Sequence, residues 1–468
     1  MVFSSSIFLF FFLPLVIAGY YLLKENYRLN FLLFASLFFY AWGEPKYVLI
    51  MLLSIVINYS FGILIHKNSA NRILAKVLLI IAIAGNLGIL FYFKYFNFTL
   101  NTANRFFKTG FEISDIALPI GISFYLFQGI SYLADLYWQK VEVQKNPAKL
   151  AFYISFFPQL MAGPIVRYND IKDQIDKRTE SVEKFISGAQ RFIIGLAKKV
   201  IIANSMGSVA DVIFGISSSE LAPEIAWLGV ICYSFQIYFD FSGYSDMAIG
   251  LGRIFGFNFL ENFNYPYISK TLTEFWRRWH ISLSSWFRDY VYIPLGGNRK
   301  GNVYANLFLV FALTGFWHGA NFQFLAWGLW HGFFLIIERL FGLREVRNKK
   351  MVPFRYALTM LIVMTGWVFF RGRGIRYALT YLGTMFGLIQ TGNMGLTLEY
   401  YLSPKIIFIL CLAVLASTPV LKVFSARFKV TDNLVIKRIS YVLILIIFFV
   451  SAVFVTASSY NPFIYFRF

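Results

Sequence analysis

Only four histidines occur among the 468 residues, and three of them follow a tryptophan within one region of the chain. These are His280 in Arg-Arg-Trp-His, His318 in Phe-Trp-His-Gly and His331 in Leu-Trp-His-Gly. Imidazole is the side chain whose unperturbed pKa lies closest to neutrality, so histidine commonly transfers protons in catalysis. The clustering therefore indicates proton-transfer chemistry, with hydrogen-bonded packing of the same rings as the alternative.

His318 is the first candidate for a general base. It lies in Thr-Gly-Phe-Trp-His-Gly-Ala-Asn, residues 314–321, where glycines bracket an aromatic pair between two apolar segments. We expect a helix to break or bend there. An ionisable group inside a membrane is costly and usually faces a water-filled path or a ligand. In an unbroken helix His331 would lie about 20 Å further along the axis, so we expect His331 to have a structural or supporting role.

The segment 272–290 is predicted to form one amphipathic helix. At about 100° per residue its leucine and aromatic side chains fall on a single apolar arc, with Arg277 and Arg288 on the opposite face. Such a helix lies along a membrane interface. His280 falls just past the edge of the arc, where its ring can face a polar cavity or the headgroups.

Two aspartates interrupt an apolar run in Tyr-Phe-Asp240-Phe-Ser-Gly-Tyr-Ser-Asp246. A carboxylate at mid-membrane costs about 3 kcal/mol, so each needs a partner, and we expect Arg253, Arg277 or Arg278 to supply it. A structural ion pair and a catalytic role both remain open for these aspartates.

Other catalytic signatures are absent from the sequence. It contains no Gly-x-Ser-x-Gly elbow, no His-Glu-x-x-His and no phosphate-binding Walker loop. Cys232 and Cys411 lie far apart in apolar runs, and neither has a metal ligand at a suitable spacing. We therefore expect no metal site and neither ATP hydrolysis nor zinc chemistry.

The composition is that of a membrane protein. Hydrophobic residues make up 58% of the chain, charged residues only 14%, and the mean hydropathy is +0.62. We predict an all-α polytopic fold with about ten to twelve transmembrane helices plus interfacial or re-entrant helices, and residues 1–468 forming a single integral membrane domain. The predicted spans lie near residues 7–23, 29–42, 47–65, 77–93, 119–138, 184–204, 221–246, 302–317, 321–340, 354–370, 405–420 and 439–457.

The net charge of +20 does not indicate nucleic-acid binding. Lys and Arg lie mainly in short connections between apolar segments, as the cytoplasmic loops of membrane proteins require. With the N-terminus outside, the connections 140–184 and 344–355 fall on the cytoplasmic side. Arg371, Arg373 and Arg376 are exceptions to this assignment.

Several blocks, in order along nearly the whole chain, resemble the membrane-bound O-acyltransferase family, and within it the bacterial branch typified by alginate O-acetylation membrane proteins. They are Met-Val-Phe-Ser-Ser at the start, Pro-Ile-Gly-Ile-Ser-Phe-Tyr from 119, Phe-Phe-Pro-Gln-Leu-Met-Ala-Gly-Pro-Ile-Val-Arg from 156, the block from 238 to 246, Glu-Asn-Phe-Asn-Tyr-Pro-Tyr from 261, Phe-Trp-Arg-Arg-Trp-His-Ile-Ser-Leu from 275 and Phe-Trp-His-Gly from 316.

The resemblance implies a ring of helices around a central funnel and an acyl transfer with two catalytic residues, His318 as the general base and His280 at the second signature position. It implies an acetyl group passing from a thioester donor, acetyl-CoA, to a hydroxyl of an extracytoplasmic polysaccharide, with no permanently bound cofactor. Arg277, Arg278, Trp317 and Asn321 are the expected substrate-binding residues.

The same resemblance implies a bacterial cytoplasmic (inner) membrane and an extracytoplasmic acetyltransferase as partner. Three alternatives remain open. The first is D-alanyl transfer towards teichoic acid, the second is a non-enzymatic transporter of the donor or polymer, and the third is a non-catalytic scaffold.

Overall fold

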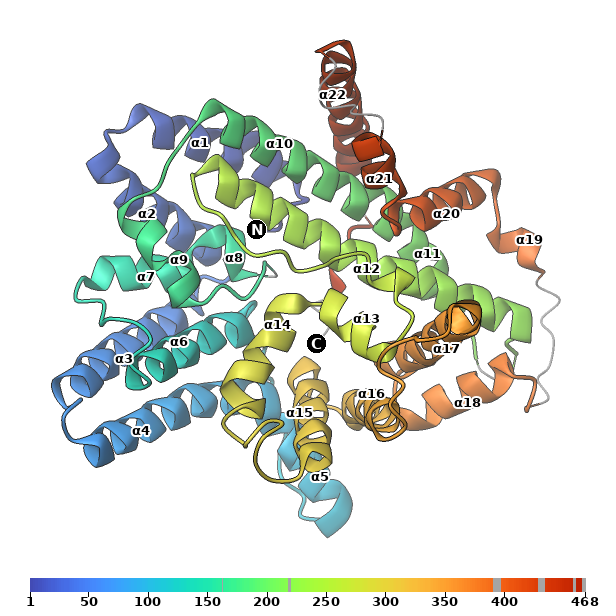
Figure 1. Cartoon of the computed structure of the whole chain (residues 1–468), viewed down its shortest axis with the longest axis horizontal. Coiled ribbons are helices and arrows are strands. Elements are labelled where there is room, and N and C mark those ends of the chain that lie inside the picture. The colour runs from blue at the N-terminus through green and yellow to red at the C-terminus, as the bar shows by residue number, and fades with distance from the viewer. Residues whose placement is uncertain (162, 218–219, 390–396, 428–433, 458–459, 465–468) are drawn as a thin grey trace. The chain divides into compact units, whose positions relative to one another are not determined.

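The computed structural model describes residues 1–161, 163–217, 220–389, 397–427, 434–457 and 460–464. Over these residues the chain forms helices and no strand (Figure 1). The all-α fold class is therefore confirmed. The chain divides into two compact units, residues 1–192 with 245–260 and residues 193–244 with 261–468. Whether they act as the single domain predicted for residues 1–468 stays a prediction.

Unit 1 is built from apolar helices that share buried polar contacts. The side chains of Asn58 and Asn86 donate hydrogen bonds to each other's carbonyl oxygens at 3.0 and 3.2 Å, a contact that joins membrane helices well. Its helices are η1 (Phe8–Phe12), α1 (Leu13–Leu22), α2 (Glu25–Gly43), α3 (Val48–Lys67), α4 (Arg72–Leu90), η2 (Phe91–Tyr95), α5 (Phe96–Phe107), α6 (Ile122–Tyr137), α7 (Pro147–Ser155), α8 (Phe157–Leu160), α9 (Tyr168–Asp176) and most of α10 (Val182–Ala197).

Unit 2 holds the three tryptophan-linked histidines. Helices α15, α16 and α17 follow one another there, and α16 packs against both of its neighbours. The helices are η3 (Lys198–Ala203), α11 (Asn204–Ile213), most of α12 (Pro223–Ile254), η4 (Pro266–Ile268), α13 (Leu272–Arg278), α14 (Ile281–Phe287), η5 (Arg288–Tyr292), α15 (Val303–His318), α16 (Phe322–Leu340), η6 (Lys349–Met351), α17 (Val352–Arg371), α18 (Ile375–Met385), α19 (Leu398–Tyr401), α20 (Pro404–Ala416), α21 (Val420–Arg427) and α22 (Leu434–Ala457).

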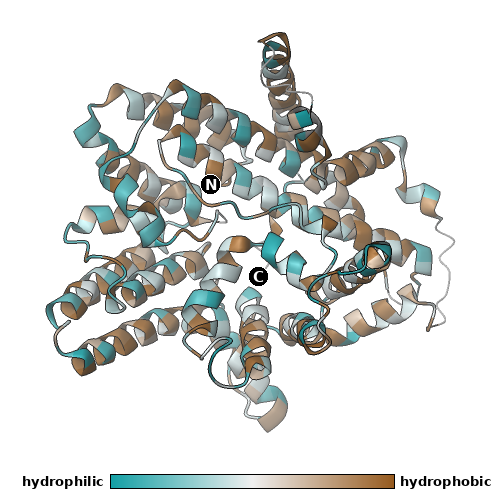
Figure 2. Ribbon diagram, in the orientation of Figure 1, coloured by the Kyte–Doolittle hydropathy of each residue, from teal (hydrophilic) through white to brown (hydrophobic). Residues whose placement is uncertain are grey.

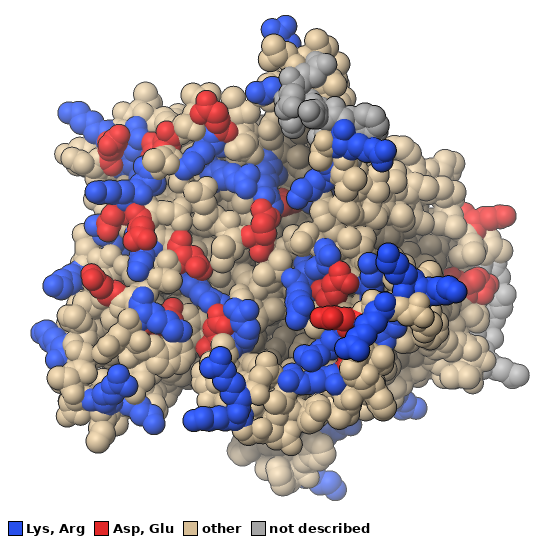
Figure 3. All heavy atoms as spheres, in the orientation of Figure 1, with Lys and Arg blue, Asp and Glu red and all other residues tan. Residues whose placement is uncertain are grey.

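Every predicted apolar run coincides with a helix, and the described residues include six helical segments long and apolar enough to cross a bilayer (Figure 2). Three further apolar helices are shorter. The number of ten to twelve spans stays a prediction. The six long segments are Val48–Lys67, Arg72–Phe107, Val182–Ile213, Pro223–Ile254, Lys349–Arg371 and Leu434–Ala457, and the three short ones are Phe8–Leu22, Val303–His318 and Pro404–Ala416. Lys and Arg side chains, interspersed with Asp and Glu, are spread over the face seen in Figure 3.

Candidate active site

Two glycines bring α15 and α16 into backbone contact just before His318. A Cβ atom added at Gly315 would lie 2.3 Å from the carbonyl oxygen of Phe324, and one at Gly328 would lie 2.3 Å from that of Phe311. Only glycine permits this approach. Helix α15 then ends at His318, and Asn321 caps α16 by accepting the backbone N–H of Gln323 at 3.4 Å. The predicted helix break is confirmed.

The His318 ring is enclosed by aromatic side chains. It contacts Trp317, Trp327 and Phe370 with ring centroids 4.8, 5.0 and 5.2 Å away, and the residue is only 6% exposed. Edge-to-face packing of this kind fixes the plane of a ring. The imidazole is therefore held in one orientation at the end of its helix.

A cavity of about 350 Å³ opens directly after His318. It is lined by both ends of the α15–α16 break, by the end of α17 and by two nearby side chains. Its lining residues are Tyr233, Gly319, Ala320, Asn321, Gln323, Phe324, Phe370, Arg371, Gly372, Arg373 and Ile464. His318 itself does not line the cavity, but Phe370 both lines it and packs on the His318 ring, so the cavity reaches a side chain in contact with the imidazole.

His280 lies at a sharp break rather than within a helix, so the single helix predicted over 272–290 is wrong. Helix α13 ends at Arg278, and His280 has a left-handed backbone with φ 42° and ψ 55° before α14 begins. This conformation costs a residue with a side chain about 1–2 kcal/mol. The preceding loop compensates for that cost, because Asn264 N–H donates to the Arg278 carbonyl and Ile281 N–H to the Asn262 carbonyl, each at 2.9 Å.

Asn262 fixes the tautomer of His280. Its side-chain oxygen accepts the backbone N–H of Ser282 at 3.2 Å and the Ser282 hydroxyl at 2.9 Å, which orients the amide, and it lies 3.1 Å from His280 Nδ1. An amide oxygen only accepts, so Nδ1 carries the proton and Nε2 keeps the lone pair. Burial lowers the pKa of His280 to about 3, so the ring is neutral at physiological pH.

Glu338 anchors the helix that leads to His280, although sequence reasoning missed it. Its carboxylate accepts the N–H groups of Leu272 and Thr273 at 2.7 and 2.9 Å and the Thr273 hydroxyl at 2.9 Å, and it faces Arg355 at 3.4 Å. A negative charge is favoured at a helix N-terminus. The sequence does contain a signal for this role, because Glu338 is an acidic residue within the apolar run 321–340 and such a residue needs a partner.

Trp317 brings the two predicted catalytic histidines together. Its ring lies 6.3 Å from that of His280 and 4.8 Å from that of His318. His331 joins the same aromatic cluster from the other side, with its ring 5.3 Å from Trp327, which also contacts His318. The helix break thus places His331 nearer to His318 than an unbroken helix would allow. The supporting role of His331 stays a prediction.

The remaining predicted substrate-binding residues lie in different surroundings. Arg278 pairs with Glu274 at 2.9 Å and donates to the carbonyl of Asn264, so it holds the local fold together. Arg277 is exposed and its charge remains accessible. Asn321 caps α16 and also lines the cavity beside His318.

The predicted arginine partners of the aspartates are wrong. Asp240 pairs with Lys199 at 2.7 Å, both side chains being almost fully buried, and also accepts the backbone N–H of Ile464. Asp246 pairs with Arg191 at 2.7 Å. Gly188 and Gly195 of α10 lie against Gly250 and Gly243 of α12. The cations therefore come from α10 and its continuation η3, and not from α13 or from Arg253 on α12 itself. The sequence pattern does not reveal this contact.

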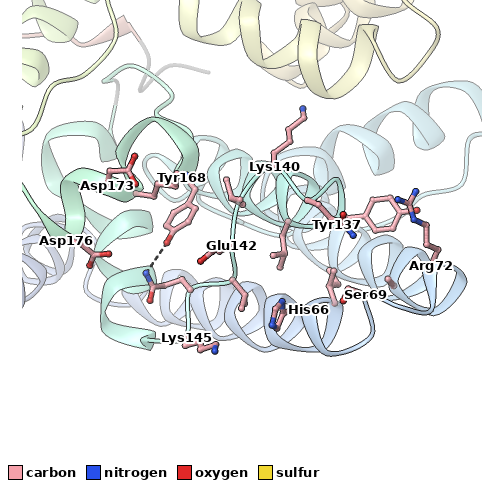
Figure 4. Close-up of a pocket in the computed structure, with 18 residues that line it drawn as sticks. His66, Ser69, Arg72, Tyr137, Lys140, Glu142, Lys145, Tyr168, Asp173 and Asp176 are labelled. Carbon is pink, nitrogen blue, oxygen red and sulfur yellow. Dashed lines mark hydrogen bonds between the residues drawn. The ribbon is translucent and has the colours of Figure 1, made fainter.

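A larger cavity of about 940 Å³ lies wholly within unit 1 and contains none of the predicted site residues. His66 from α3, Lys145 from the segment before α7, and Tyr168 from α9 project around it (Figure 4), and Gln144 donates to the Tyr168 hydroxyl at 2.9 Å. Its walls mix both signs of charge. Among the described residues no group of three His, Cys, Asp or Glu side chains is arranged to hold a metal ion.

Comparison with known proteins shows which family the chain resembles in sequence. Residues 139–384 match the membrane-bound O-acyltransferase (MBOAT) family. The chain is 41% identical to a probable alginate O-acetylase of Pseudomonas putida, over the full length of both proteins. It is 36% identical to a peptidoglycan O-acetyltransferase of Helicobacter pylori, over all of this chain and 98% of that protein. A teichoic acid D-alanyltransferase of Bacillus subtilis is 31% identical over 53% of this chain and 65% of its own.

Proposed function

This chain belongs to the membrane-bound O-acyltransferase family and is a multi-pass membrane O-acyltransferase, and from that premise we propose that it transfers an acetyl group from a cytoplasmic thioester, acetyl-CoA, for O-acetylation of an extracytoplasmic polysaccharide. The observation that carries the proposal is His318, a buried imidazole at a helix break, with a cavity opening at the next residue. Phe370 links the two, because it lines the cavity and contacts the His318 ring.

We propose that His318 is the general base. A neutral imidazole nitrogen accepts the proton of the acceptor hydroxyl as its oxygen attacks the thioester carbonyl carbon. The carbon–sulfur bond then breaks, the thiolate takes up the proton, and an ester and a free thiol remain. General-base assistance of this kind contributes about 10²–10⁴ in rate. The aromatic rings around His318 exclude water, which protects the thioester from hydrolysis.

His280 has a different proposed role, because its Nε2 accepts hydrogen bonds and does not donate them in this tautomer. This nitrogen is suited to accepting a hydrogen bond from an N–H or O–H group of a substrate bound next to Trp317. Exposed Arg277 is suited to the phosphates of the donor, and Arg278 to holding α13 in place. A donor to the developing oxyanion is then expected from Asn321, whose side chain lines the cavity.

Acetyl transfer to a polysaccharide is favoured over D-alanyl transfer by the extent of the similarity. The alginate and peptidoglycan relatives match the whole chain, whereas the teichoic acid D-alanyltransferase matches only about half of it. We accordingly propose a location in the bacterial inner membrane and an extracytoplasmic acetyltransferase as the partner that completes the transfer. The basic segment 344–355 would then face the cytoplasm.

The test is thioester consumption by the purified chain in liposomes supplied with labelled acetyl-CoA and an oligosaccharide as the hydroxyl acceptor. We expect His318→Ala to lower the rate at least about 100-fold, and His66→Ala, which removes the exposed histidine of unit 1, to leave it unchanged. Consumption that needs no ion gradient separates the enzyme from a transporter. Equal rates for the two variants would refute the proposed role of His318, and polymer acetylation in cells carrying His318→Ala would favour a scaffold.

A further inference from the structure

Asn262 has no direct part in the proposed reaction, yet it holds the chain around His280. It is 1% exposed and lies beside His280, although 18 residues separate the two along the chain. Its backbone carbonyl accepts the N–H of Ile281 at 2.9 Å, and its side-chain oxygen lies within hydrogen-bond distance of His280 and Ser282. One buried residue therefore contacts His280 and the two residues that follow it.

The backbone N–H of Ser282 decides which way the Asn262 amide points. That group can only donate, so the amide atom 3.2 Å from it is the oxygen, and the same oxygen lies 3.1 Å from His280 Nδ1. Nδ1 must then carry a proton, since an amide oxygen only accepts. In a neutral imidazole without such a partner the proton can lie on either nitrogen. Asn262 thus selects the tautomer in which Nε2 accepts.

Aromatic rings fix the direction in which Nε2 points. Phe241 of α12 meets the His280 ring edge-on, with centroids 4.6 Å apart and an interplanar angle of 89°, and Phe263 stacks against it at 6.5 Å and 19°. The indole of Trp317 lies at 6.3 Å. Contacts of this kind hold the plane of a ring, so both the protonation and the orientation of His280 are set by its surroundings.

The groups that make these contacts are phenyl, indole and amide groups, none of which ionises. Of the charged residues that adjoin them along the chain, Asp240 and Arg278 each form an ion pair with another residue, and Glu261 is exposed. The imidazole of His318 packs on the other contact of the same indole. Burial lowers the pKa of His280 to about 3, so the ring carries no charge at neutral pH.

We propose that Asn262 is a positioning residue of the acyltransferase, which keeps His280 neutral and makes its Nε2 a permanent hydrogen-bond acceptor for the substrate. The inference rests on the proposed function, since it takes His280 as a substrate contact. A carboxylate at this position would also hold the Nδ1 proton, but its charge would stabilise the protonated ring, whose Nε2 donates. The amide fixes the tautomer and adds no charge.

The test is Asn262→Asp, which keeps the size of the side chain and the accepting oxygen and adds one charge. A nearby opposite charge raises the pKa of an imidazole, so we expect His280 of the variant to titrate between about pH 4 and 6. Near about pH 7.5 the variant should transfer acetyl groups at a rate similar to that of the unsubstituted chain. Its relative rate should then fall by up to about tenfold for each pH unit below the new pKa.

Two further variants serve as controls for the added charge and for the lost hydrogen bond. Asn264→Asp adds the same charge two residues further along the loop, on an exposed side chain, and its pH–rate profile should follow that of the unsubstituted chain. Ser282→Ala removes only the hydroxyl that donates to Asn262 at 2.9 Å and leaves the backbone N–H in place. It should keep the tautomer and gain no new ionisation.

Nitrogen-15 spectra of the histidine rings report the tautomer whether or not transfer occurs. The chain has four histidines, so the His280 signals are assigned by their loss in His280→Gln. A proton on Nε2, titration of the unsubstituted ring near about pH 6.5, or equal pH–rate profiles for Asn262→Asp and Asn264→Asp would overturn the inference and leave the reaction standing. The expected tautomer without acetyl transfer by any chain would retain the neutral, accepting His280 and reject the reaction.

Discussion

Replacing Gly315 with alanine tests whether the close approach of α15 and α16 positions His318. The new Cβ atom would lie 2.3 Å from the Phe324 carbonyl oxygen and 3.1 Å from the Cα of Gly328, whereas ordinary contact begins at 3.4 Å. The helices must therefore shift by about 1 Å, because backbone atoms cannot rotate aside as a side chain does. Overpacking of this kind costs about 1–3 kcal/mol. His318 follows within one helical turn, and a displacement of about 1 Å lowers a rate about 100-fold.

The assay is thioester consumption at equal amounts of folded protein in liposomes, together with thermal unfolding in detergent. We expect Gly315→Ala to be about 100-fold slower with only a modest loss of stability. Gly85→Ala is the matched control, since Gly85 lies in α4 with nothing within 4 Å of the added atom, and it should keep the full rate and gain about 0.5–1 kcal/mol. Equal rates for the two variants would refute the reasoning.

Two further predictions concern how His280 is held. Glu338→Gln removes the charge that caps α13 and faces buried Arg355, so the free energy of unfolding should fall by about 2–4 kcal/mol, seen as a lower melting temperature. The exposed Glu345→Gln is its control, and equal melting temperatures would mean that Glu338 does not anchor α13. His280→Asn keeps a residue that tolerates the left-handed backbone and should make stability less sensitive to pH. The unfolded imidazole, with its ordinary pKa of 6.5, takes up a proton below that pH, whereas the buried ring, with its pKa lowered to about 3, does not. The unsubstituted chain should therefore lose stability as pH falls from about 7 to 5, by up to about 1.4 kcal/mol per pH unit more than the variant. Identical pH slopes in thermal unfolding would contradict this account.

The helices were predictable from the sequence because a bilayer leaves the backbone few choices. Without water to satisfy its polar groups, an apolar run forms a helix whatever its neighbours are, and each predicted run does coincide with one. The break after His318 was also predictable, since glycine and asparagine there end one helix and cap the next. The break within the segment 272–290 was not predictable, because the apolar arc of this segment fits one continuous helix as well as it fits two short ones. The break arises from hydrogen bonds between the Asn262–Asn264 loop and the chain around His280.

The family and the membrane setting could be recognised from the chain alone, and so could the candidate histidines, since these depend on residue type, order and local periodicity. Which groups meet became clear only from the folded chain: Trp317 contacts two histidine rings, Asn262 contacts one imidazole, Lys199 pairs with Asp240, and Glu338 binds the start of α13. The hydrogen-bonded partners lie far apart in the sequence: His280 and Asn262 are 18 residues apart, and Leu272 and Glu338 are 66 residues apart. Their pairing depends on how the helices pack, and the order of residues along the chain does not show which helices are neighbours.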